Sequence, residues 1–144
     1  MSASFQKFYI FPEHLAKKVH NLATDTLKVM LTNVAPVPST TVKKGDLTDI
    51  TAQNGYSAGG NQAAQASCTQ TSGTLKLVLE DPTTWQAVNG SFGPFQYAVL
   101  YNDSDAATPK AVIGYWDYGS SVTVLEGETF KCDFSPTTGV LTIA

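Results

Sequence analysis

The sequence predicts a mainly β fold: a single antiparallel β-sandwich or jelly-roll-like domain with one short N-terminal helix and a long loop or arm. Residues 92–134 contain strand-length segments rich in Val, Tyr, Phe, Trp and Thr, and short turn sequences separate them. About eight such segments follow one another at the even spacing typical of sandwiches and jelly rolls. The length of 144 residues suits one well-buried core, so residues 1–144 are expected to form one domain.

The N-terminal segment, residues 1–23, is expected to carry the helix. Pro12 suits the first helical turn, and Glu13 complements the positive end of the helix dipole. An apolar stripe at helical spacing is formed by Leu15, Val19 and Leu22. A helix this short must dock on the rest of the domain to persist.

The next apolar run, residues 26–34, predicts a strand with Leu27, Val29 and Leu31 on one face. Residues 111–116 are apolar on both faces, which indicates a central strand covered on both sides. Two turn pairs are typical of hairpins between the strands that flank them: Asn89-Gly90 and Glu126-Gly127.

Residues 35–60 differ from the segments on either side. They hold few core-forming side chains, several glycines and one aromatic, Tyr56, that looks exposed. A stretch of this length without clear structure is uncommon inside a compact domain, so we expect an extended arm or functional loop that contacts a partner. Deleting it is expected to leave a folded core. The candidate contact residues in this segment are Lys43, Lys44, Asp46, Asp49 and Tyr56.

The charge balance argues against nucleic acid as a partner. The net charge is −3, all nine basic residues are lysines, and Arg, the usual reader of phosphates and base edges, is absent. Only 15% of residues are charged, so any partner should be met through shape, backbone edges and aromatic side chains. No segment has the length of a bilayer span or the apolar run of a signal peptide. We therefore expect assembly in a cytoplasm, without membrane contact.

The cysteines and histidines give no recognisable catalytic or metal-binding motif. Cys68 and Cys132 are expected to be free thiols, with Cys132 pointing into the core between two phenylalanines. His14 and His20 lie six residues apart without sharing a helical face, which favours solvated or boundary positions over a zinc site.

Two further clusters have a chemical and a structural interpretation. Residues 102–105, Asn-Asp-Ser-Asp, offer oxygens to calcium, but a polar β-turn is favoured because the spacing of an EF-hand is missing. Asp117 stands between Trp116 and Tyr118, as in a sugar-binding platform, although core positions are favoured for the two rings. No nucleophile, acid–base pair, metal or cofactor site emerges, so we expect a protein that is not an enzyme.

Four segments resemble a family of small virion proteins of tailed bacteriophages and prophages. They are KVHNLATDTLKVMLTNVAPVPS, DLTDITAQNGYSAGGN, SGTLKLVLEDPTTWQAVNGSFGPFQYAVLYND and IGYWDYGSSVTVLEGETFKCDF, and together they cover nearly the whole chain. The resemblance implies a capsid decoration or cement protein, a minor capsid component on the outside of the head. It implies no catalytic residues.

From this resemblance we expect the protein to bind the major capsid protein and itself, as a homotrimer on the capsid surface of a virion assembled in the host bacterial cytoplasm. The alternative is a receptor- or carbohydrate-binding module of the tail, favoured if Tyr56, Trp85 or Trp116 lies exposed beside a groove. An enzyme would be favoured only if Asp103, Asp105 or Asp117 met a histidine in a cleft.

Overall fold

The computed structural model describes residues 3–104 and 110–144. Across these residues the chain forms ten strands, one α-helix and one 3-10 turn. The strands are β1 (Phe5–Lys7), β2 (Leu27–Thr32), β3 (Asn61–Gln62), β4 (Gln65–Thr71), β5 (Thr74–Leu79), β6 (Trp85–Gln86), β7 (Phe92–Asn102), β8 (Val112–Val124), β9 (Thr129–Phe130) and β10 (Leu141–Ile143). The helix α1 spans Phe11–Ala16, and the 3-10 turn η1 spans Lys44–Asp46.

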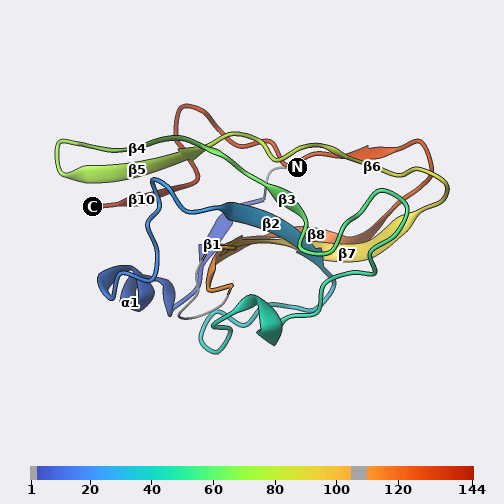
Figure 1. Ribbon diagram of the computed structural model, residues 1–144, viewed down its shortest axis with the longest axis horizontal. Helices are drawn as coiled ribbons and strands as arrows, with labels where there is room; N and C mark the ends of the chain where they lie inside the picture. The colour runs from blue at the N-terminus through green and yellow to red at the C-terminus, as the bar shows by residue number, and fades with distance from the viewer. Residues whose placement is uncertain (1–2, 105–109) are drawn as a thin grey trace.

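The strands form two layers, which confirms the predicted mainly β, antiparallel, sandwich-like fold (Figure 1). The lower layer is a five-stranded sheet in the order β1-β8-β7-β2-β3. The upper layer consists of a three-stranded sheet, β10-β5-β4, and a separate two-stranded pair, β6-β9. Every pairing is antiparallel. The helix α1 lies beside one end of the lower sheet and beneath the β10-β5-β4 sheet (Figure 1), with Phe11 packed in the main core.

The main core lies between the two layers. Leu27, Val29 and Leu31 of β2 are fully buried in it, as their period-two spacing predicts. From the opposite layer Leu77 and Leu79 of β5 reach the same cluster. The aromatic end of this core, under β6 and β9, is filled by Trp85, Phe92, Phe95 and Phe130.

The outer face of the lower sheet is also buried where β2, the end of β7 and the start of β8 meet. Met30, Val99 and Val112 point to this face, and Phe8 and Leu47 cover them in a second apolar cluster. Residues 111–116 therefore form an inner strand with both faces covered, as their apolar pattern predicts. Two layers of side chains thus fix the five-stranded sheet, and the segments that supply the second layer belong to the core.

The helix is shorter than its sequence pattern predicts. It ends at Ala16 because Lys18 adopts a left-handed conformation, with φ of 64°, and the backbone N–H groups of Lys18 and Val19 turn back to the carbonyls of Leu15 and His14. The predicted stripe of Leu15, Val19 and Leu22 therefore does not lie on one helical face. Pro12 does occupy the first turn.

Both hairpin predictions are wrong. The turn at Asn89-Gly90 connects β6 to β7, but β6 pairs with β9, and β7 pairs with β8 and β2. Likewise, Glu126-Gly127 connects β8 to β9, which lie in different sheets. Positive φ angles at Asn89, Gly90 and Gly127 explain why the sequence carries turn residues at both places. These turns carry the chain from one layer to the other.

No helix in the described part of the chain is long and apolar enough to cross a membrane.

Candidate partner-binding surface

The segment 35–60 packs along the lower sheet instead of extending away from it. Its backbone bonds to the ends of the strands: Lys44 N donates to the Lys110 carbonyl at 2.8 Å, and Ile50 N donates to the Leu31 carbonyl at 3.2 Å. Leu47 and Ile50 are buried in the two apolar clusters. The expectation of a segment that stands apart from the core is therefore wrong.

Tyr56 anchors the end of this segment in the main core. Its side chain is 3% exposed, so the predicted exposed aromatic is a buried one. Its ring stacks near Phe92, and its hydroxyl accepts the Leu31 N–H at 3.0 Å and donates to the carboxylate of Asp49. Burial, reinforced by Asp49, raises the pKa of Tyr56 above the ordinary tyrosine value, so the hydroxyl keeps its proton.

Asp49 ties several parts of the segment together. Besides the Tyr56 hydroxyl it accepts the Gly59 N–H at 2.6 Å, and Lys44 Nζ lies 3.5 Å from its carboxylate. Lys44 Nζ also sits 5.9 Å from the centre of the Tyr101 ring. These side chains stabilise the segment from within.

Of the five predicted contact residues, two offer exposed side chains to a partner. Lys43 and Asp46 lie at the exposed turn η1, where the Asp46 carboxylate accepts the N–H groups of Val42 at 2.9 Å and Lys43 at 3.2 Å. Lys44 and Asp49 are half-buried and Tyr56 is buried. A contact made by this segment would therefore be centred on η1.

An exposed aromatic that the sequence reading missed lies at the turn between β1 and α1. Tyr9 is 70% exposed, while Phe8 and Phe11 on either side of it are buried in the core. Its N–H donates to the Pro38 carbonyl at 2.9 Å, which brings the exposed Val37 into its neighbourhood. The sequence gives no signal for this position, because nothing in the run FYIF shows which of its three aromatic side chains faces solvent.

A second candidate surface is an aromatic groove of about 850 Å³ beside the β1 edge of the lower sheet. Trp116 lies in its wall with Phe5 at 5.2 Å and Phe134 stacked at 5.1 Å between ring centres. Tyr118 presents a more exposed ring, and the irregular segment 131–140 closes one side. Because Trp116 contacts two other rings and is only half-exposed, Tyr118 is the ring with more surface left for a ligand.

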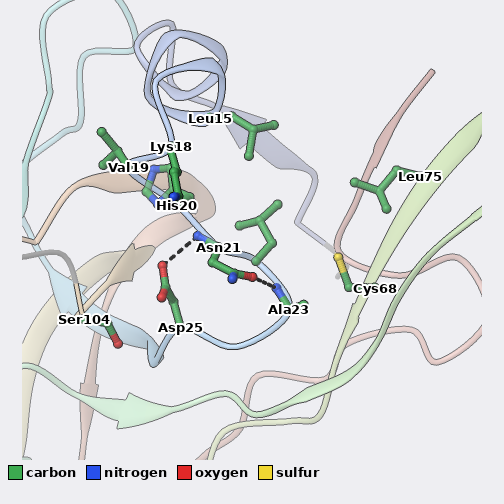
Figure 2. A pocket seen from close by; sticks show the side chains of 11 residues that line it. Leu15, Lys18, Val19, His20, Asn21, Ala23, Asp25, Cys68, Leu75 and Ser104 are labelled. Carbon is green, nitrogen blue, oxygen red and sulfur yellow. Dashed lines mark hydrogen bonds between the residues drawn. The ribbon is translucent and has the colours of Figure 1, made fainter.

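A third region, shown in Figure 2, is a pocket of about 530 Å³ between the α1–β2 connection and the β4–β5 hairpin. Asp25 accepts the Asn21 N–H at 2.7 Å and the Asn102 side-chain amide at 2.6 Å. The same amide nitrogen lies 3.0 Å from Nδ1 of His20. These polar side chains hold the end of β7 against the connection.

The histidines are buried, contrary to the expected solvated or boundary positions. The turn after α1 folds the chain back, so the ring of His20 lies 5.9 Å from that of His14 and 5.4 Å from Phe11. Neither sequence spacing nor composition reveals this, because the contact depends on the left-handed residue Lys18.

The Asn-Asp-Ser-Asp cluster is a turn in the part that the structure describes; Asp105 lies outside the described residues. The Asn102 side-chain oxygen accepts the Ser104 N–H at 2.8 Å. Asp103 pairs with Lys110 and, at 3.2 Å, with Lys28. Within residues 3–104 and 110–144 no three His, Cys, Asp or Glu side chains gather in a way that would hold a metal ion.

The remaining sequence-predicted residues are placed as follows. Asp117 accepts the Gln96 side-chain amide at 2.9 Å and the Gly119 N–H at 2.8 Å on the exposed part of β8. Trp85 is 1% exposed and packs in the main core. Cys68 and Cys132 are free, and both are partly buried against the main core. Burial, with a contribution from Asp81, raises the pKa of Cys132 to about 12.

The chain matches no protein-family model, no curated protein and no solved structure.

Proposed function

We propose that this protein is a non-enzymatic structural component of a phage virion, a decoration or cement protein that binds the outside of the head and stabilises neighbouring major capsid subunits. The sequence resemblance to small virion proteins suggests this role. The observation that supports a protein-binding role is Tyr9, an aromatic side chain held outward on a rigid turn.

The rigidity of the turn matters for binding energy. Buried Phe8 and Phe11 fix the backbone on both sides of Tyr9, and the bond to Pro38 fixes the turn itself. A partner that buries Tyr9 therefore orders little that is not ordered already. Exposed aromatics of this kind are typical anchors of protein interfaces. The exposed charges of Lys43 and Asp46 at η1 supply candidate polar contacts on the same segment as Val37.

The non-enzymatic part of the proposal rests on the reactive side chains that line the pocket of Figure 2. The side-chain amide nitrogen of Asn102 lies between the Asp25 carboxylate and the His20 ring and contacts both. An amide does not relay protons, so this contact does not make an acid–base pair of Asp25 and His20. The Cys68 thiol in the same pocket has its pKa raised by burial, the opposite of what activates a nucleophile.

The alternative, a receptor- or carbohydrate-binding module of the tail, is supported by one specific observation. Trp116 lines a groove but is only half-exposed, and Tyr118 adds a ring that is 42% exposed. Tyr56 and Trp85, the other two rings that it invoked, are buried.

The test compares two exposed tyrosines in binding to heads that lack the protein. Tyr9→Ala is expected to weaken binding roughly thirtyfold, as for an interface anchor, while Tyr118→Ala, the matched control, leaves it unchanged. Heads without the protein should release their DNA at a lower temperature, and adding back the parent protein should reverse this.

Two results would contradict the proposal. Particles that lose the protein yet keep their DNA-release temperature would exclude a cement role. Loss of binding in Tyr118→Ala but not in Tyr9→Ala, with density at the tail tip, would favour the receptor-binding alternative.

A further inference from the structure

The strand β4 is an edge without the usual protection against pairing. It is the outermost strand of the order β10-β5-β4 and runs along the rim of the upper layer (Figure 1). Its sequence, QASCTQT, contains neither a charged residue nor a proline. Natural edge strands commonly carry such residues to prevent pairing with other chains. A bulge between Gln65 and Ser67 leaves Ser67–Thr71 as the part with regular register.

The turn that follows β4 fixes which backbone groups point outward. Ser72 and Gly73 have φ angles of 52° and 85°, so they form a two-residue hairpin turn with both central residues left-handed. In such a hairpin the flanking pair, Thr71 and Thr74, exchanges hydrogen bonds, and the bonded pairs then alternate. The N–H and C=O groups of Cys68 and Gln70 therefore point away from β5.

We propose that two copies of this chain pair through β4, antiparallel about a two-fold axis centred on Cys68, to form one continuous six-stranded sheet. Cys68 then exchanges hydrogen bonds with Cys68 of the second copy, and Ser67 lies opposite Thr69. This pairing goes beyond the proposed function and is independent of it, because it is a property of the isolated chain.

Charge and symmetry favour a second copy of the chain over another partner. An uncharged strand opposes no like charges when it pairs with itself, and a two-fold axis matches each outward donor to an outward acceptor. The charged side chain opposite Thr69 on β5 is Lys76, and its ammonium is bonded to the Thr137 carbonyl at 2.8 Å. A two-fold contact through β4 is compatible with a trimer. In a closed shell built from trimers, two-fold axes relate neighbouring trimers.

The position of Cys68 provides the assay. Directly opposed residues in a hydrogen-bonded antiparallel pair have Cα atoms about 5.5 Å apart, which lies within the range for a disulfide. In purified protein carrying Cys132→Ala, copper-catalysed oxidation is expected to link two chains through Cys68, as seen by non-reducing electrophoresis. The catalyst is needed because the partly buried Cys68 thiol holds its proton more tightly than a free cysteine.

Charge variants on the outward face of β4 test the register. Ser67→Lys with Thr69→Lys places two pairs of like charges across the axis and should slow cross-linking about tenfold. Ser67→Glu with Thr69→Lys makes the same pairs opposite in sign and should restore it. Light scattering on the unoxidised proteins should follow the same order, with a mass of two chains in the parent.

Thermal melting of both variants controls for folding, since Thr69 is exposed and Ser67 only half-buried. Cross-linking that is equally fast in the two charge variants would overturn the proposal. So would oxidation of the parent protein that yields no linked pair.

Discussion

At the scale of single residues, the hydroxyl of Tyr56 joins two parts of the chain that are distant in sequence. It accepts the N–H of Leu31 on β2 and donates to Asp49, whose carboxylate also accepts the Gly59 N–H. Because the site is buried, each of these polar groups depends on the others for its partner.

Replacing Tyr56 by Phe keeps the ring and removes the hydroxyl. The buried Leu31 N–H then loses its partner, so the free energy of unfolding should fall by about 1–3 kcal/mol in urea titration. Tyr118→Phe, at an exposed tyrosine, should change it by less than about 0.5 kcal/mol. If Tyr56→Phe changed the free energy of unfolding as little as Tyr118→Phe, the Tyr56 hydroxyl would not contribute to stability.

Asp103 predicts how stability changes in acid. Burial alone would raise its pKa, but the hydrogen bond from Lys110 and the charge of Lys28 outweigh burial and lower the pKa below the ordinary 3.8. The unfolded chain then binds a proton at higher pH than the folded one, so this stabilisation is complete above about pH 5 and is lost as pH falls through the folded pKa.

Asp103→Asn should therefore destabilise the protein at neutral pH and flatten its stability between about pH 5 and pH 3, measured by urea titration at each pH. Asp133→Asn, on the exposed segment after β9, is the matched control. A steep acid dependence that survives in Asp103→Asn but disappears in Asp133→Asn would refute this account.

At the scale of elements, the segment 35–60 acts as a cover for the lower sheet. Its apolar side chains are few, but Leu47 lies in the outer cluster and Ile50 and Tyr56 in the main core. The sheet would otherwise expose Met30 and Val99 to water. Removing the whole segment should thus unfold the chain, where the sequence alone had suggested a core that remains folded.

A gentler test of this cover is Ile50→Ala, which should lower the free energy of unfolding by about 2–4 kcal/mol because it leaves a cavity at the edge of the core. Val34→Ala, at an exposed position outside the cluster, should cost less than about 0.5 kcal/mol. Both values come from urea titration. A small effect of Ile50→Ala would mean that the segment only rests on the sheet.

The elements that the sequence predicts well are those with dense apolar patterns. The sequence predicts the strand at 27–32 from its alternating apolar side chains, and the start of β8 at 112–116 from an apolar run. Tyr56 was missed because a single aromatic in a polar segment has no periodicity to show which way it faces. The turn pairs at 89–90 and 126–127 were misread because turn residues encode φ angles and not which strands pair.

The candidate surfaces were harder to predict than the strands. Tyr9 is distinguished from its aromatic neighbours only by the turn that buries Phe8 and Phe11. The polar contacts of Asn102 join residues about eighty positions apart in the chain, through bonds to Asp25 and beside His20. No local pattern in the sequence marks such pairs.

At the scale of the whole molecule, each layer combines a hairpin of consecutive strands with pairings between strands that are distant in sequence. In the lower layer β7 and β8 follow each other in sequence and share the longest pairing. The distant pairings are β1 with β8 and β2 with β7 in the lower layer, and β5 with β10 and β6 with β9 in the upper layer. The two sheets of the upper layer, β10-β5-β4 and β6-β9, share no strand pairing. They are held together by the packing of their side chains on the lower layer.

That division of the upper layer has a kinetic consequence. Each of its long-range pairings closes a large loop before it gains any contact energy, while the β4–β5 and β7–β8 hairpins close short ones. The chain therefore belongs among the slower folders, on the millisecond-to-second scale. While β9 and β10 are unpaired, the aromatic rings at that end of the core remain open to water and to other chains, so the risk of aggregation is greatest before these pairings form.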